Sequence, residues 1–158
     1  MANTQSMCTS FMGELMTATH NFGTAPIRAV ITADTFKGAL YLTSATLNAS
    51  TTAYSATGEV SGTGYSAGGV TVTNATAPTA TNSSTTAGVA YWTPSASLVF
   101  TSVTLTTAFD TVLIYNSTQS NKAVSVHTFG AQTITAGTFT LTMPANTTST
   151  ALLRLATT

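Results

Sequence analysis

Few side chains in this sequence could bind a metal ion or transfer a proton near neutral pH. They are Cys8, Glu14, His20, Asp34, Glu59, Asp110 and His127. Zinc sites place cysteine and histidine ligands at short, regular spacings, and glycoside hydrolysis needs two carboxyl groups at one site. The seven residues show no such spacing. We therefore predict no metal-binding residue and no catalytic pair of carboxylates.

Both histidines have a structural explanation, and no serine has the setting of a nucleophile. His20 is predicted near the carboxyl end of a helix, where the helix dipole favours a cation, and His127 lies in a predicted strand. A G-x-S-x-G motif, which would present an activated serine, does not occur. We predict that the protein is not an enzyme, with no catalytic residue and no cofactor.

The segment of residues 59–69, EVSGTGYSAGG, is rich in glycine around a single tyrosine. A phosphate-binding loop requires a lysine after its last glycine, and a dinucleotide fingerprint requires a preceding strand and a following helix. Neither context is present. We interpret these glycines as residues that supply positive φ in a loop or bulge, with Tyr65 as its anchor.

Charged residues make up only 5% of the chain, and their charges sum to zero. An ordinary globular domain has about 25%. Nucleic acids and anionic membranes are bound by clusters of lysine and arginine, which four scattered cations cannot form. The composition therefore predicts neither a nucleic-acid partner nor a membrane partner. Because zero net charge favours self-association, we expect a subunit that buries its surface against other proteins.

The length of 158 residues predicts a single domain, residues 1–158, with a hydrophobic core that needs no metal or disulfide. One cysteine permits no disulfide within the chain. No secretion signal is visible at the start, so we expect a protein that is not secreted. No apolar run approaches the roughly 20 residues that span a bilayer.

Residues 7–22 are predicted to form the one helix of the chain. Apolar residues recur at the spacing of one helical face: Met7, Phe11, Leu15, Ala18 and Phe22. Gly23 is placed to end the helix. Such a short helix persists only when it packs on other structure. We expect its apolar face to lie on the sheet or on a neighbouring subunit.

The remainder, residues 27–158, is predicted to be mainly β. Strands are expected at residues 27–32, 36–43, 70–74, 88–93, 97–105, 111–116, 123–129, 133–135, 138–143 and 151–156. The segment 36–43 reads as a half-buried strand, 75–87 as a surface loop and 136–137 as a tight turn, whereas 111–116 is apolar on both faces like a central strand. Many short strands at this spacing indicate an antiparallel β-sandwich or a jelly-roll-like barrel.

Five segments give the chain a resemblance to small virion structural proteins of tailed bacteriophages: MANTQSMCTSF, DTFKGALYLTSAT, EVSGTGYSAGG, AFDTVLIYNST and TAGTFTLTMP. The chain looks most like a head decoration, or capsid cement, protein. The resemblance implies a virion protein, made in the host cytoplasm, that binds the major capsid protein or other virion proteins and stabilises the shell. It also implies a homo-oligomer, since such proteins are often trimers.

Two other virion roles agree with the same residues. One is a tail- or fibre-associated domain that binds a receptor or a glycan, and the other is an Ig-like module of a head–tail connector. A fibre role would favour aromatic residues on exposed loops, whereas the candidates for it lie mostly beside predicted strands: Tyr54, Tyr65, Tyr91 and Trp92. The candidate residues for protein–protein contact surround the predicted core and are Phe11, Leu15, Phe22, Ile27, Arg28, Val30 and Tyr65.

Overall fold

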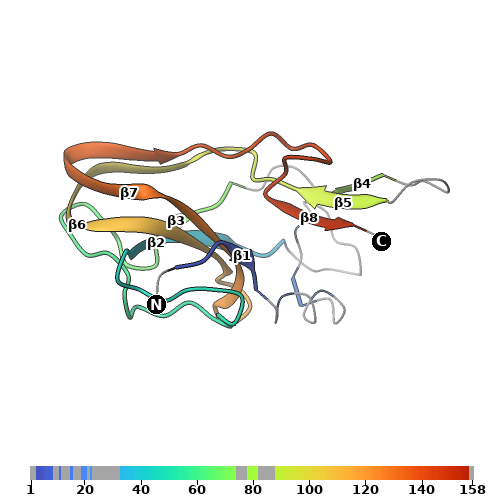
Figure 1. Ribbon diagram of the computed structural model, residues 1–158, viewed down its shortest axis with the longest axis horizontal. Helices are drawn as coiled ribbons and strands as arrows, with labels where there is room; N and C mark the ends of the chain where they lie inside the picture. The colour runs from blue at the N-terminus through green and yellow to red at the C-terminus, as the bar shows by residue number, and fades with distance from the viewer. Residues whose placement is uncertain are drawn as a thin grey trace.

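The computed structural model describes residues 3–8, 11, 15, 19–20, 22, 33–73, 78–81 and 88–156 (Figure 1). The elements of this part are all strands, so the fold is mainly β, as predicted. They are β1 (Ser6–Met7), β2 (Phe36–Leu42), β3 (Val70–Thr71), β4 (Thr79–Ala80), β5 (Val89–Trp92), β6 (Leu98–Asn116), β7 (Lys122–Leu141) and β8 (Leu153–Ala156). All pairings are antiparallel, in two sheets of order β1–β7–β6–β2–β3 and β4–β5–β8.

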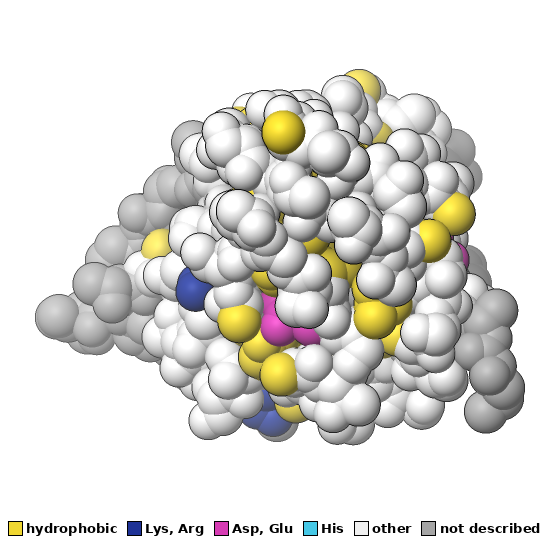
Figure 2. Space-filling model, turned by 90° about the vertical axis from the view of Figure 1, so that its left-hand side faces the viewer, with side chains coloured by type: hydrophobic (Ala, Val, Ile, Leu, Met, Phe, Trp, Pro, Cys, Tyr) yellow, Lys and Arg dark blue, Asp and Glu magenta, His cyan; other side chains and the backbone are white. Residues whose placement is uncertain are grey.

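One long hairpin dominates the architecture. β6 and β7 pair from Leu98 opposite Leu141 to Asn116 opposite Lys122, and the register shifts repeatedly near the middle. Extra residues on one strand and then on the other bend an antiparallel pair. The ribbon accordingly turns back on itself at one end of the molecule (Figure 1), and from that end the surface is mostly uncharged (Figure 2).

The bend divides the hairpin into two layers. The outer layer consists of residues 98–105 and 134–141, and the inner layer consists of residues 109–116 and 122–129 with β1, β2 and β3. Residues 111–116 are all buried, which confirms the predicted central strand. The two layers approach closely at Gly38 of the inner layer, because a Cβ there would lie 2.5 Å from Cδ1 of Leu98 in the outer layer.

The prediction of a half-buried strand at residues 36–43 is wrong for β2. Ala39 and Tyr41, which alternate with the expected core residues, are only 0% and 2% exposed. The reason is that the segment after β2 folds back over the sheet, where the Tyr41 hydroxyl donates to the Ser55 carbonyl oxygen. A local pattern of alternation cannot reveal such a return of the chain.

The three-stranded sheet lies at the end opposite the bend (Figure 1). Trp92 of β5 is buried in the same core as the large sheet, with its ring 4.7 Å from that of Phe22 and 6.1 Å from that of Phe36. The two antiparallel sheets are therefore consistent with a sandwich. Each sheet is open, because β1 and β3 border the first and β4 and β8 border the second.

Several predicted strand boundaries are also wrong. Residues 97–105 and 111–116 belong to the single strand β6, and the three strands expected within residues 123–143 form the single strand β7. Ala136 has positive φ, at 47°, but it lies in a bulge of β7 and not in a tight turn, because Gly137 pairs with Val103. β4 lies within the loop that was expected at residues 75–87. Long-range pairing overrides these local turn signals.

The predicted helix at residues 7–22 is not supported. Met7 is extended in β1, opposite Ser125, and no helix is among the elements of the described part. The side chains of Phe11, Leu15 and Phe22 join the core or pack against it. Most other residues of this segment lie outside the described residues, as do residues 27–32 of the predicted strand.

Candidate functional site

The carboxylate of Glu59 is the centre of a tyrosine cluster. Its Oε1 accepts hydrogen bonds from the Tyr65 hydroxyl and the Gly68 N–H, both at 2.7 Å. Its Oε2 accepts one from the Tyr54 hydroxyl at 2.7 Å. The ring of Tyr54 stacks on Tyr115, whose hydroxyl donates to the Gly68 carbonyl oxygen at 2.8 Å. This Glu59 cluster joins the loop after β2, the glycine-rich segment and β6.

The phenols of the Glu59 cluster are held in their neutral form. Burial and then the hydrogen bond to Glu59 raise the pKa of Tyr54 to about 12 and raise the pKa of Tyr65 well above its ordinary value. Burial and then the charge of Glu59 also raise the pKa of Tyr115. A phenol that keeps its proton is a weak base and a weak nucleophile at neutral pH. The geometry fits a clamp on the glycine-rich segment.

The glycine-rich segment covers the edges of two strands. Leu40 N–H of β2 donates to the Tyr65 hydroxyl at 3.1 Å, so a side chain occupies the place of a neighbouring strand. A Cβ on Gly64 would collide with the Ser102 carbonyl oxygen of β6, and only glycine permits that approach. The interpretation of this segment as a loop with positive φ is confirmed at Gly64, Gly68 and Gly69.

A second polar network is buried among phenylalanine rings. Asn116 Nδ2 donates to Asp34 Oδ2 at 2.7 Å and lies 3.1 Å from His20 Nδ1. Asp34 Oδ1 accepts from Gln119 Nε2 at 3.2 Å, and Gln119 N–H donates to Asn116 Oδ1 at 3.2 Å. The ring of His20 packs edge-on against Phe11, 4.9 Å away. The network ties the turn between β6 and β7 to the segment that leads into β2.

Ser125 and His127 share one face of β7, because residues two apart in a strand point the same way. His127 Nε2 lies 2.8 Å from Ser125 Oγ, as a base lies beside a nucleophile in hydrolases. Burial lowers the pKa of His127 to about 4, and Ser125 is fully buried. The described residues place no carboxylate on the other imidazole nitrogen. The pair therefore lacks the orienting acid of a triad, and its histidine is a weak base at neutral pH.

A cleft of about 300 Å³ lies over this pair, between the two layers. Its walls are mainly apolar, with Val112 and Ile114 of the inner layer facing Leu141 and Met143. None of the residues that line it is charged. The volume is at the lower limit of small-molecule sites, and the lining suits only an uncharged molecule.

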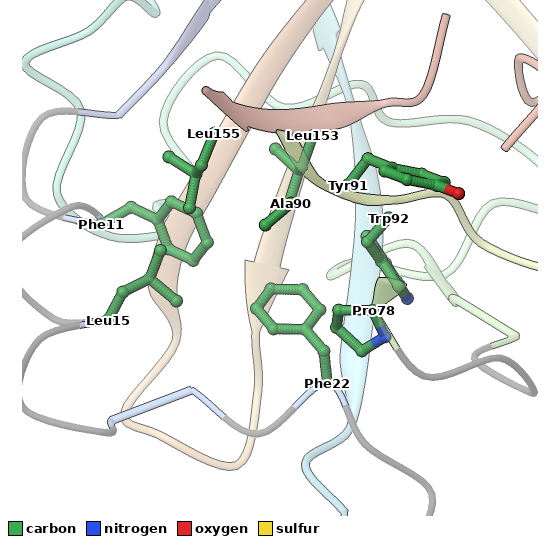
Figure 3. Close-up of a pocket in the computed structure, with 9 residues that line it drawn as sticks. All are labelled: Phe11, Leu15, Phe22, Pro78, Ala90, Tyr91, Trp92, Leu153 and Leu155. Atoms are coloured by element: carbon green, nitrogen blue, oxygen red, sulfur yellow. The ribbon is translucent and has the colours of Figure 1, made fainter. Parts of the chain in front are cut away.

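An apolar groove lies between the three-stranded sheet and side chains from the N-terminal segment (Figure 3). It is lined by Phe11, Leu15, Phe22, Pro78, Ala90, Tyr91, Trp92, Leu153 and Leu155. Leu155 is 41% exposed. The volume of about 90 Å³ is well below the roughly 300–1,000 Å³ of small-molecule sites. The groove has room for a small apolar group and not for a cofactor.

The structure brings three of the predicted contact residues together in this groove. Phe11 and Phe22 have ring centroids 5.8 Å apart and are 2% and 7% exposed, while Leu15 packs beside them. In the single chain these rings fill the core, and their contact with a partner stays a prediction. Tyr65 lies apart from them, in the Glu59 cluster, with its ring stacked on Phe100. The other candidates lie outside the described residues: Ile27, Arg28 and Val30.

Sequence reasoning missed the Asn116 network because its partners His20 and Asp34 are distant in the chain. Asn116 meets Asp34 across 82 residues, and neither segment carries a pattern that predicts the contact. The other two arrangements are local, since Ser125 and His127 have the i, i+2 spacing of a strand and the donors to Glu59 are 5, 6 and 9 residues from it. In the part of the chain that the structure describes, no three His, Cys, Asp or Glu side chains form a group that could hold a metal ion.

No protein-family model matches this chain, and no curated protein or solved structure is significantly similar to it. Among the described residues, no helix is long and apolar enough to cross a bilayer.

Proposed function

We propose that this protein is a structural subunit of a bacteriophage particle that binds the capsid shell as a decoration, or cement, protein and stabilises it. The resemblance of five segments to virion proteins supports this proposal. The composition agrees with it, since a chain with 5% charged residues and zero net charge suits wide, uncharged contacts with other proteins.

The observation that carries the proposal is an outer layer without charge. Residues 98–109 and 130–143 contain no Asp, Glu, Lys or Arg. Most of the exposed positions of these segments are threonines, namely Thr101, Thr106, Thr107, Thr133, Thr135, Thr138, Thr140 and Thr142. Figure 2 shows that the surface at the bent end is mostly uncharged, with only isolated charged groups. Contacts through hydroxyl and methyl groups are little affected by salt, which suits a particle that meets varied media.

The aromatic residues favour this role over glycan recognition. All 7 phenylalanines, 5 tyrosines and the tryptophan lie in the described part, and each is buried or half-buried. A tail or fibre domain that stacks sugars would expose some of these rings. A receptor-binding tail or fibre domain, or a head–tail connector module, remains the alternative that the following experiment distinguishes.

The number of copies on the particle tests the proposal. Particles assembled with this chain should carry it in a fixed ratio to the major capsid protein, measured by quantitative mass spectrometry, with density over the shell in cryo-electron microscopy. Shells that lack the chain provide the control, and adding the purified protein should raise the temperature at which they break. A few copies per particle, located at the neck or tail, would refute the decoration role and support the alternative.

A further inference from the structure

The outer layer has an open edge along β7. β1 pairs with β7 only at Ser125 and Val126. From there to Leu141, β7 pairs with β6 on one side, and no strand of the described part lies on the other side. In Figure 1 this stretch runs along the upper border of the molecule. Within the described part of the chain, its outward N–H and C=O groups therefore have no strand to pair with and can bind another one.

The opposite edge of the outer layer is covered. Thr104 N–H of β6 donates to the Thr63 carbonyl oxygen at 2.8 Å. Beside this bond, Gly64 packs on the backbone at Ser102. Among the described residues, the glycine-rich segment therefore covers the β6 edge, whereas no strand covers the β7 edge.

The open edge has few of the devices that normally prevent strands from pairing. Edge strands are commonly guarded by lysine, by inward-pointing charges or by proline. Residues 130–143 contain none of these. Bulges of β7 interrupt the edge at Ala136 and between Thr128 and Gln132. The uninterrupted part is residues 137–141, in which Thr138 and Thr140 are exposed and Phe139 is half-buried.

We propose that residues 137–141 of two copies of this chain pair antiparallel, so that two outer layers join as one four-stranded sheet across a two-fold axis. An antiparallel edge is its own complement in backbone hydrogen bonding, and a two-fold axis brings identical surfaces together. A charged edge would repel its copy, whereas this one places threonines opposite threonines, a pairing that stabilises sheets. The role of this pairing would be to join subunits on a particle, and that role rests on the proposed function.

The test measures oligomeric state in the full chain. The wild-type protein, whose monomer mass is 16.1 kDa, should be a dimer in sedimentation equilibrium, with slow amide hydrogen exchange at residues 137–141. Thr140→Lys places like charges across the axis and should weaken dimerisation at least tenfold, with faster exchange there. Thr101→Lys is the matched control, because Thr101 is an exposed threonine of the same layer on β6. This variant should dimerise as the wild type does.

A second measurement remains informative if Thr140→Lys does not fold. Cys8 is buried and is the only cysteine, so a Cys8→Ala background allows single cysteines to be placed at will. In the proposed register Thr138 of one chain lies opposite Thr140 of the other, so mixed Thr138→Cys and Thr140→Cys chains should form a disulfide with each other on mild oxidation. Mixed Thr101→Cys and Thr140→Cys chains should not. The absence of a disulfide between Thr138→Cys and Thr140→Cys chains would overturn the pairing.

The outcomes separate this inference from the proposed function. A monomer with fast exchange at residues 137–141, or a trimer that Thr140→Lys leaves intact, would overturn the pairing. If that monomer or trimer still bound capsid shells in proportion to the capsid protein, the decoration role would stand alone. A dimer that Thr140→Lys dissociates, but that does not bind shells, would support the pairing and refute the decoration role.

Discussion

Replacing Glu59 by glutamine tests whether the Glu59 cluster holds the glycine-rich segment in place. Three donors point at the carboxylate, from Tyr54, Tyr65 and Gly68. A hydrogen bond to a charged group contributes roughly 1.5–3 kcal/mol, and because Glu59 is half-buried we use the lower end of this range. Glutamine can restore two neutral hydrogen bonds of about 1 kcal/mol each. Glu59→Gln should therefore lower the free energy of unfolding by about 2.5 kcal/mol.

Urea and thermal unfolding at neutral pH, followed by circular dichroism, measure this loss. A change of about 2.5 kcal/mol corresponds to a fall in Tm of about 5–10 °C for a chain of this length. Tyr91→Phe is the control, since Tyr91 lies outside the cluster, and it should change the free energy by less than about 0.5 kcal/mol. A double-mutant cycle with Tyr54→Phe should show coupling of about 1 kcal/mol. If Glu59→Gln resembled the control, or if the cycle were additive, the proposed clamp would be refuted.

Three further predictions concern pH and packing. Burial lowers the pKa of His127 to about 4, so below about pH 6.5 His127 binds a proton in the unfolded chain but not in the native chain. The free energy of unfolding should fall by up to about 3 kcal/mol as the pH falls from about 6.5 to about 4. The urea midpoint of His127→Gln should depend less on pH across this range than that of the wild type. Parallel curves of midpoint against pH for the two proteins would contradict the assignment. With the pKa of Tyr54 raised to about 12, stability should also fall as pH rises above about 10, where the unfolded chain loses phenolic protons first. In the Tyr91→Phe variant, which keeps only tyrosines with a raised pKa, tyrosinate absorbance should then appear together with unfolding, and its appearance in the folded state near pH 10 would contradict this. Gly38→Ala should cost about 1–3 kcal/mol, because its Cβ would lie 2.5 Å from Leu98 Cδ1. Leu98→Val should offset part of that loss in the double variant, and additive losses would show that the two residues do not compete for space.

The bend of the hairpin shows where prediction from sequence fails. Residues 97–105 have the pattern of one strand, residues 111–116 are apolar on both faces, and the pattern changes between them. The change predicts two separate strands, but in the structure it is a set of bulges within the single strand β6. A bulge and a turn use similar residues, and only the partner strand decides between them.

The N-terminal segment fails for a related reason. Phe11, Leu15 and Phe22 recur at helical spacing, and the structure shows that these three side chains join the core or pack against it. Met7 pairs with Ser125, more than a hundred residues away, and that pairing is invisible to a local pattern. Of the predicted contact residues, the structure thus gathers these three apolar ones and places Tyr65 elsewhere.

The sequence by itself determined the class of the fold and its centre. Alternating threonines and apolar residues specify strands, and a run that is apolar on both faces, residues 111–116, specifies a strand covered on both sides. The scarcity of charge likewise follows from composition alone. Tertiary structure alone decided that Asn116 would meet Asp34, and that, among the described residues, one edge of the outer layer would be capped while the other stayed open. Both depend on contacts between distant segments, whose formation is set by packing of the whole chain and not by any local run of residues.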